Sequence, residues 1–126
     1  MQQETSLYIK QKNNIPLGAG GNHYTWGDNC DGWVLVDTEA LSVKQECMPA
    51  QTGEALHYHQ KAQQFFFILT GIATFEVENE IYTVHPGQGF HIEAGKTHRI
   101  LNNTPQDLEF ILSSQPSTGN DRFNCV

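Results

Sequence analysis

The stretch His57-Tyr-His-Gln-Lys-Ala-Gln-Gln-Phe-Phe-Phe-Ile-Leu-Thr-Gly71 is the part of the chain from which the fold is most readily inferred. His57 and His59 are two residues apart, so in an extended strand both imidazoles point to the same face. The apolar run 65–69 is too short to span a membrane, and its aromatic residues indicate a strand buried on both faces. Together with the amide of Gln64, the stretch predicts two adjacent strands that bring two imidazoles and an amide to one interior point.

The rest of the chain is a series of short strand candidates separated by turn residues. No helical apolar periodicity persists for three turns in the sequence. Short strands at this spacing are typical of an all-β sandwich or barrel. The predicted strands are 33–37, 41–48, 54–59, 63–70, 72–77, 81–84, 90–92, 97–102 and 107–113, and a further strand-like piece covers 6–10.

A third imidazole candidate, His98, follows the turn at Gly95. The turn makes this imidazole the first interior residue of a strand that, in a barrel, can lie beside the strand of His57 and His59. Three imidazole nitrogens and the amide oxygen of Gln64 can then converge on one metal ion. Imidazole suits Zn, Cu, Fe or Ni, and carbonyl oxygens shift the preference towards Mn. We therefore predict a divalent transition metal (Zn, Fe, Ni or Mn) without selecting among them.

The spacing of these residues resembles the two motifs of the cupin superfamily, whose members are small double-sheet jelly rolls. The first motif (Gly, five residues, His-x-His, three or four residues, Glu, six residues, Gly) is matched by His57, His59, Gln64 and Gly71. The second motif (Gly, five residues, Pro-x-Gly, two residues, His, three residues, Asn) is matched by Gly87, Gly95, His98 and Asn102. The resemblance implies an all-β double-stranded β-helix, or jelly-roll barrel, with a metal on His57, His59, Gln64 and His98.

The chain departs from the cupin motifs at three positions. Gln64 stands where the motif has Glu, Glu93 stands where it has Pro, and the first glycine is displaced to Gly53. Without the glutamate, mechanisms that need a carboxylate there, such as that of oxalate-degrading cupins, are in doubt. The ligand set His, His, Gln, His is similar to that of small cupins that linearise unsaturated uronates. The resemblance therefore implies a metal-binding cupin that acts on a small polar molecule, such as a sugar or sugar acid, by isomerisation or ring opening.

Two other functions remain open from the sequence. A metal-dependent dioxygenase would require a redox-active metal and O2, whereas isomerisation would not. A non-enzymatic module that binds a small ligand or a metal is favoured by the lack of a visible acid/base pair. No catalytic residue can be named, so whether the protein is an enzyme is also open. Glu93 is most simply an exposed turn residue, with a general acid or base at the pocket rim as its alternative role.

Alternation along the strands predicts which apolar residues line a pocket. Counting from Gln64, the side chains of Phe66 and Ile68 share the face of the predicted metal site, and Ile100 is the third pocket-lining candidate. Cys47 alternates with residues 43 and 45 and is interpreted as a small buried hydrophobe. The phenylalanines expected mainly in the core are Phe65, Phe66, Phe67, Phe75 and Phe90.

Composition narrows the classes of partner. The net charge is −7, the pI is about 5.2, and no cluster of Lys or Arg is present. These values argue against nucleic acid and against an anionic membrane surface, and leave a small molecule as the expected ligand. The 3 cysteines show no CxxC spacing, which argues against a disulfide framework and a zinc ribbon. The first residues lack a signal-peptide pattern, so a cytoplasmic location is expected.

A length of 126 residues predicts one domain, with residues 1–126 as a single cupin domain. Within it, 1–32 would hold an N-terminal strand and a glycine-rich loop, 33–114 the barrel, and 115–126 a tail over the surface. Open sheet edges need covering. The strand-like piece at 6–10 could cover the edge of a neighbouring subunit, so we predict a homodimer formed by sheet extension.

Overall fold

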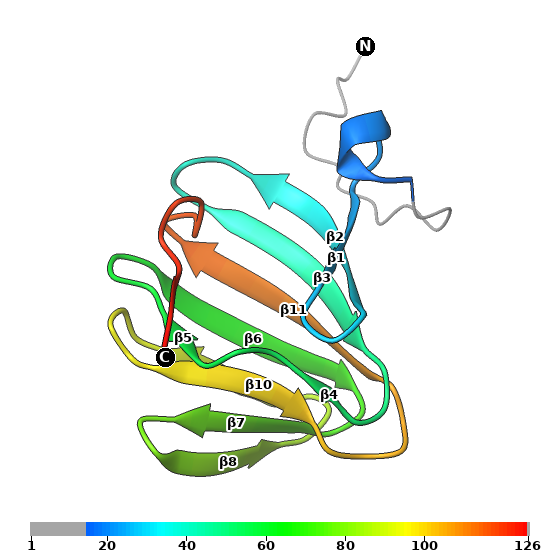
Figure 1. Cartoon of the computed structure of the whole chain (residues 1–126), viewed down its shortest axis with the longest axis vertical. Helices are drawn as coiled ribbons and strands as arrows, with labels where there is room; N and C mark the ends of the chain where they lie inside the picture. Colours follow the sequence, from blue (N-terminus) through cyan, green and yellow to red (C-terminus); the bar gives the residue numbers. More distant parts are fainter. Residues whose placement is uncertain (1–14, 126) are drawn as a thin grey trace.

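The computed structural model describes residues 15–125, and these residues form mostly antiparallel strands (Figure 1). The strand-like piece at 6–10 lies outside the described residues. A short 3-10 helix, η1 (Leu17–Ala19), precedes the first strand. The strands are β1 (His23–Trp26), β2 (Cys30–Asp37), β3 (Ser42–Met48), β4 (Thr52–Gly53), β5 (His57–Tyr58), β6 (Gln63–Thr70), β7 (Ala73–Val77), β8 (Glu80–Val84), β9 (Gly89–Ile92), β10 (His98–Asn102), β11 (Leu108–Gln115) and β12 (Phe123–Asn124).

The strands form two sheets of six that face each other (Figure 1). The first sheet has the order β1-β2-β3-β11-β6-β9, and the second has the order β12-β5-β10-β7-β8, with β4 also paired to β10. Neighbours in a sheet are often distant in sequence; for example, β11 pairs with β3 on one side and with β6 on the other. The prediction of an all-β jelly-roll fold is confirmed.

Alternate residues of both sheets point into the space between them and form one core. In β6, Gln64, Phe66 and Ile68 are buried, and the residues between them are exposed. The ring of Phe66 packs edge-on against Phe75, with ring centroids 4.9 Å apart. The core cluster consists of Cys30, Met48, Phe66, Ile68, Ala73, Phe75, Val84, Ile92, Ile100, Leu108, Phe110 and Leu112.

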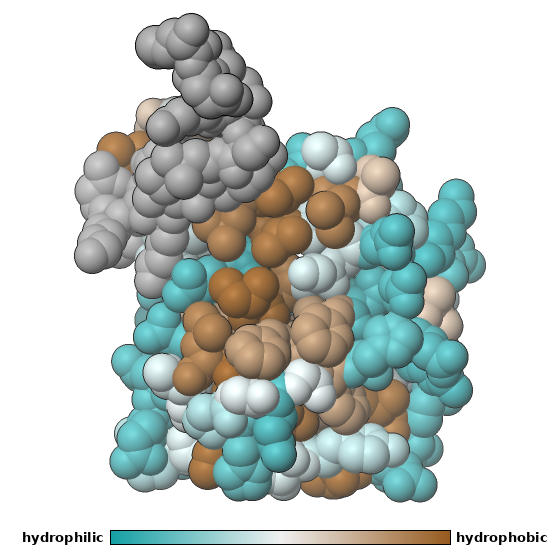
Figure 2. All heavy atoms as spheres, turned by 180° about the vertical axis from the view of Figure 1, so that it is seen from behind, coloured by the Kyte–Doolittle hydropathy of each residue, from teal (hydrophilic) through white to brown (hydrophobic). Residues whose placement is uncertain are grey.

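The outer face of β6 is apolar and open. Phe65 is 45% exposed, and Phe67 and Leu69 are each 39% exposed. The expectation of a strand buried on both faces, with Phe65 and Phe67 in the core, is therefore wrong. In a two-layer sandwich each strand turns one face to the other sheet, and no other described element covers the second face. Figure 2, which views the molecule from behind, shows apolar side chains gathered in the middle of one face.

The segments next to the histidines differ from the predicted strands. Of the strand expected at 54–59, only β5 is formed, and β4 lies just before it; the two pair with opposite ends of β10. The strands β1, β4 and β12 had not been predicted. The tail that was expected to run over the surface carries the exposed strand β12, which pairs with β5.

The glycine at position 71 has a steric reason. Gly71 has φ +81°, and a Cβ at this position would lie 2.4 Å from the carbonyl oxygen of Asp107. Only glycine combines this backbone conformation with so close an approach of a neighbouring chain segment. Within residues 15–125, no helix is long and apolar enough to cross a membrane.

Candidate metal centre

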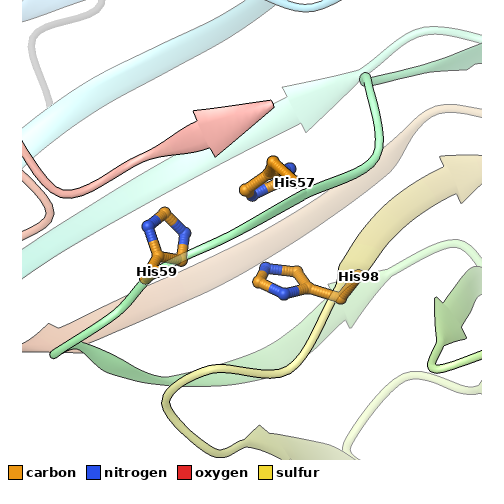
Figure 3. Close-up of side chains that lie close together, drawn as sticks. All are labelled: His57, His59 and His98. Atoms are coloured by element: carbon orange, nitrogen blue, oxygen red, sulfur yellow. The ribbon is translucent and has the colours of Figure 1, made fainter. Parts of the chain in front are cut away.

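Three histidines meet between the sheets, at the end of the barrel where β5 and β10 are neighbours (Figure 3). The pairing of these strands places His57 directly opposite His98, and their ring centroids are 4.4 Å apart. The ring of His59 lies 5.0 Å from His57 and 5.4 Å from His98. One potential ligand atom from each ring lies within 4.8 Å of the others, and all three side chains are buried. The structure thus brings together the three histidines that the sequence singled out, in a cluster that could hold a metal ion.

A backbone carbonyl orients each imidazole. Because a carbonyl oxygen only accepts hydrogen bonds, each Nδ1 carries the proton, and each neutral ring keeps a lone pair on Nε2. Outer hydrogen bonds of this kind are usual for metal-binding histidines. The Nδ1 donors and carbonyl acceptors are His57 with Ala55 (2.8 Å), His98 with Lys96 (2.8 Å) and His59 with Asp121.

The surroundings of the Nε2 atom of His59 indicate whether the three histidines fit a metal ion. It is buried, and it has no hydrogen-bond partner among the described residues. A buried polar atom without a partner is unfavourable by about 1–3 kcal/mol. A divalent ion accepts lone pairs from imidazole nitrogens, so it would satisfy this atom together with the other two rings. The donor set therefore fits a metal ion.

The protonation of the rings agrees with this role. Burial lowers the pKa of His57 to about 3, and the neighbouring His98 lowers it further. Burial likewise lowers the pKa of His98 to about 4, and it lowers the pKa of His59. All three rings are consequently neutral at physiological pH, which is the form that binds a metal.

Gln64 lies beside the histidines on β6, with a side chain that is almost fully buried. Its Nε2 donates to the hydroxyl of Ser114 at 3.1 Å, and its Oε1 lies 3.1 Å from Nε2 of His98. The proton of neutral His98 is on Nδ1, so these two facing atoms are both acceptors. Two acceptors at this distance are stable if a cation lies against both, or if the amide turns round and donates to the ring.

The C-terminal segment holds the loop that follows His59. The carboxylate of Asp121 accepts hydrogen bonds from the backbone N–H groups of Gln60, Lys61 and Ala62 at 2.8, 3.0 and 3.0 Å. Although burial opposes this shift, these three donors lower the pKa of the Asp121 carboxyl. The carbonyl of the same residue accepts from Nδ1 of His59. One residue of the tail therefore fixes both the loop and the ring orientation.

A cavity of about 200 Å³ opens beside the histidines. Its wall combines apolar and aromatic side chains with charged and hydrogen-bonding groups. Its lining residues are Tyr24, Trp26, Lys44, Glu46, Glu54, His57, His59, Gln64, Phe66, Ile100, Leu112, Thr118 and Arg122.

The predicted pocket residues separate into two groups. Phe66 and Ile100 line the cavity, whereas Ile68 lies in the core and does not line it. Glu93 is exposed and lies outside the cavity, so it is not placed to act there. The histidines and the amide were found from their spacing, but the acids and cations of the cavity were not.

Two of these four missed residues, Lys44 and Glu46, come from the inner face of β3. Ser42, Glu46 and Met48 are buried and Cys47 is only partly buried, so the interpretation of Cys47 as the interior residue is wrong. The strand has the opposite phase because Met48 packs in the core. With this alternation, Lys44 and Glu46 point towards the cavity. The signal available in the sequence was that these two charged residues alternate with Met48, a core residue.

Glu46 and Tyr24 form a hydrogen-bonded pair in the cavity wall. The phenol of Tyr24 donates to Oε2 of Glu46, which is 7% exposed. Burial raises the pKa of the Glu46 carboxyl to about 7, against the opposing effect of the Tyr24 hydrogen bond. Burial and the nearby carboxylate raise the pKa of Tyr24, so its proton stays on the phenol.

The second acid of the cavity, Glu54, is held by two donors. Its Oε1 lies 3.5 Å from an Nη atom of Arg122, and its Oε2 accepts from the N–H of Ile100 at 3.2 Å. Burial raises its pKa to about 7, and Arg122 opposes this shift. Glu46 is thus the acid whose charge no cation within ion-pair distance compensates, since none of the described ion pairs includes it.

Comparison with known sequences gives one family and one curated relative. The Cupin_2 family, described as a cupin domain, matches residues 44–114. The uncharacterized HTH-type transcriptional regulator YdeC of Bacillus subtilis (strain 168) is 38% identical over 56 residues, which are 44% of this chain. The match covers only 19% of the length of that regulator.

Several solved structures share the fold. KdgF from Halomonas sp. superposes with a TM-score of 0.72 at 16% identity, over 89% of this chain and 95% of that one. A sugar phosphate isomerase of the cupin superfamily from Silicibacter pomeroyi DSS-3 has a TM-score of 0.68 at 16% identity, over 82% and 75%. The polyketide cyclase RemF from Streptomyces resistomycificus has a TM-score of 0.70 at 14% identity, over 81% and 75%. At these identities the likeness concerns the fold.

Proposed function

Since the chain belongs to the cupin-domain family, we propose that it is a metal-dependent enzyme that isomerises or ring-opens a small polar molecule, such as a sugar or sugar acid. One observation carries this proposal. Two histidines of the cluster, His57 and His59, line the same cavity of about 200 Å³ as the buried acid Glu46. Ligand pockets for drug-sized molecules have about 300–1,000 Å³, so this cavity suits a small ligand.

The metal would be held by His57, His59 and His98, with Gln64 as the fourth ligand. The support is the lone pair on each Nε2 and the position of the Gln64 oxygen 3.1 Å from Nε2 of His98. All four ligands are neutral, which disfavours hard cations and suits Zn, Fe, Ni or Mn. When bound, such an ion supplies Lewis acidity towards a carbonyl or hydroxyl oxygen.

Glu46 is the group that would move a proton. A carboxyl with a pKa near the working pH can both take and return a proton, and burial raises the pKa of Glu46 to about 7. The Tyr24 phenol fixes the orientation of this carboxylate by its hydrogen bond. Glu54 is less suited, because Arg122 and the N–H of Ile100 occupy its oxygens. The proposed reaction needs one such group to shift a proton during isomerisation or ring opening.

Elemental analysis and proton exchange test this function together. Wild-type protein, reconstituted separately with Zn, Fe(II), Ni and Mn, should bind one ion per chain, and His98→Ala should lose most of it. Turnover of a panel of sugars and sugar acids is then followed by proton NMR in D2O. Glu46→Gln should lower kcat by about 100-fold or more, the usual contribution of a general base, with the metal content unchanged. Glu80→Gln, at an exposed position, is the matched control.

The outcomes separate the alternatives. A wild-type protein that binds no metal after reconstitution would refute the proposed function. Turnover that survives in Glu46→Gln would remove this residue from the mechanism. Oxygen uptake with enols or thiols, without isomerisation, would favour a metal-dependent dioxygenase.

A second candidate function is a non-enzymatic module that binds a small ligand. The similarity to the regulator YdeC over 56 residues favours it. Such a module would bind a sugar or sugar acid in the cavity, but the bound molecule would be recovered unchanged and no deuterium would enter it from D2O. Saturable binding without exchange would therefore select this candidate.

The assembly and location belong to the same proposal. We propose a single cupin domain over 1–126 that works in the cytoplasm as a homodimer, with no nucleic-acid or membrane partner. The open apolar face with Phe65, Phe67 and Leu69 supports self-association, since exposed apolar patches mark interaction sites. The net charge of −7 speaks against binding to nucleic acid or to an anionic membrane.

A further inference from the structure

Lys44 is a cation of the cavity wall that forms no ion pair within residues 15–125. It shares the inner face of β3 with Glu46, and it is only partly exposed. Its Nζ lies 5.4 Å from the centre of the Tyr24 ring. Glu46 is directed to the Tyr24 hydroxyl and Glu54 to Arg122, so neither acid pairs with it. No described carboxylate lies within ion-pair distance of the Lys44 ammonium.

An ammonium drawn partly out of water is stable only if other groups compensate its charge. The face of an aromatic ring compensates part of it, since a cation over such a ring gains about 0.5–1 kcal/mol at exposed sites. Lys44 nevertheless adds to the positive potential in the cavity, because it lowers the pKa of Glu46 against the larger, opposite effect of burial. The cavity wall therefore carries, beside His57 and His59, an ammonium that forms no ion pair with any described carboxylate.

The charges in the wall indicate what kind of anion would match this site. Among the described residues, Arg122 forms an ion pair with Glu54 at 3.5 Å, whereas Lys44 is in none of the ion pairs. One ammonium complements a singly charged carboxylate, whereas a phosphate monoester carries nearly two charges at neutral pH and would face the buried Glu46 as well. The small volume of the cavity limits the ligand to a few carbons beyond the anionic group.

We propose that the cavity recognises a small monocarboxylate, whose carboxylate binds to the Lys44 ammonium while its hydroxyl or carbonyl oxygens face His57, His59 and Gln64. This inference rests on the proposed function, because it takes the cavity as the ligand site, and it specifies an acid where that function allows a neutral sugar. It also assigns the carboxylate to the β3 side of the cavity and leaves the imidazole side to the uncharged oxygens.

Calorimetric titration tests the assignment with defined probes. D-glucuronate, D-galacturonate, D-glucose and D-glucose 6-phosphate are titrated into wild-type protein, both metal-free and loaded with zinc. The variants are Lys44→Met, which removes the charge and keeps the side-chain length, and Lys44→Arg, which keeps the charge. Lys61→Met is the control, since Lys61 is exposed and does not line this cavity. Thermal unfolding of each variant verifies that it is folded.

We expect at least one of the two hexuronates to bind at least tenfold more tightly than glucose. Lys44→Met should remove this preference, a tenfold loss or more, which is the usual effect of deleting a charge-assisted hydrogen bond. Lys44→Arg should retain the preference within about threefold, and Lys61→Met should not change it.

Three results would overturn the inference: no saturable binding of either acid, a preference for acids that survives in Lys44→Met, or tighter binding of glucose 6-phosphate than of either hexuronate. The zinc-free titrations separate this failure from failure of the proposed function. A protein that binds zinc and turns over a neutral sugar but shows no preference for acids keeps the function and loses the carboxylate site. A protein that binds no metal but shows the Lys44-dependent preference keeps the carboxylate site and loses the function.

Discussion

Removing the carboxylate of Asp121, which lies outside the histidine cluster, should lower both the stability of the fold and the affinity for a metal ion. The Asp121→Ala substitution deletes the acceptor of three backbone N–H groups, those of Gln60, Lys61 and Ala62. A hydrogen bond to a charged group contributes about 1.5–3 kcal/mol. Gln60 and Lys61 are exposed, so water can replace their acceptor, whereas Ala62 is buried. We therefore expect the free energy of unfolding to fall by about 3 kcal/mol, below the simple total of three bonds.

The same substitution should weaken metal binding, because the carboxylate anchors residue 121 to the loop, and without this anchor its backbone carbonyl holds the His59 ring less firmly. Loss of such an outer partner typically lowers metal affinity by about 10–100-fold. Urea unfolding of the metal-free protein measures the first effect, and competition for zinc with a chelating dye measures the second. A loss of 3 kcal/mol corresponds to a drop in Tm of roughly 10 °C for a domain of this size. Asp107→Ala, which removes an exposed carboxylate, is the matched control.

The pH dependence supplies an independent check on this carboxylate. Because the pKa of Asp121 is lowered in the folded state, its stabilising effect is present above the unfolded pKa of about 3.9 and is lost as the pH falls through the folded pKa. Asp121→Asn should therefore show a flatter loss of stability below about pH 4 than the wild type. An Asp121→Ala protein that unfolds within about 0.5 kcal/mol of the wild type would refute the argument, since surface changes have effects of that size. A large loss of stability with unchanged zinc affinity would leave Asp121 a purely structural role.

Three further predictions concern an acid, a glycine and the outer face. Burial raises the pKa of Glu46 to about 7, so the stability that its protonated form contributes at low pH is lost as the pH rises towards and through 7. Between pH 5 and pH 8, the free energy of unfolding of Glu46→Gln, measured in urea, should therefore rise by about 1–3 kcal/mol relative to that of the wild type. A difference between the two proteins that stays constant with pH would contradict this. Gly71 has φ +81°, and a Cβ there would lie 2.4 Å from the carbonyl oxygen of Asp107, so Gly71→Ala should lower the free energy of unfolding by about 3 kcal/mol or more. Gly87 has the same φ but open space around it, so Gly87→Ala should lower it by only about 1 kcal/mol. Equal losses in the two variants would show that the clash at position 71 is relieved. Phe67→Ser should convert the proposed homodimer to a monomer in light scattering, and a wild type that is already monomeric at micromolar concentration would exclude the dimer.

Much of the fold and the histidine cluster were predictable from local patterns. The strands β6 and β10 begin and end within about two residues of their predicted bounds, because turn residues and short apolar runs are local signals. The histidines were predicted for a related reason. His57 and His59 are close in sequence, and the turn at Gly95 sets the first interior position of the next strand at His98.

The environment of the histidines depended on contacts that no local pattern reveals. Tyr24 meets Glu46 across 22 residues, and Asp121 reaches the loop after His59 from 62 residues away along the chain. The pairing of β1 with β2 and of β2 with β3 brings the first two together. A strand pattern predicts two faces but not which neighbour each face will meet, and for β3 the sequence interpretation chose the wrong face.

By itself, the sequence determined the strand order along the chain and the spacing of three imidazoles and an amide. Only the tertiary structure decided which face of β6 is covered, why position 71 needs glycine, which acid shares a cavity with His57 and His59, and that no described carboxylate pairs with Lys44. The physical reason is that alternation and turns act over a few residues, whereas burial, pKa and charge compensation depend on groups that long-range strand pairing brings together.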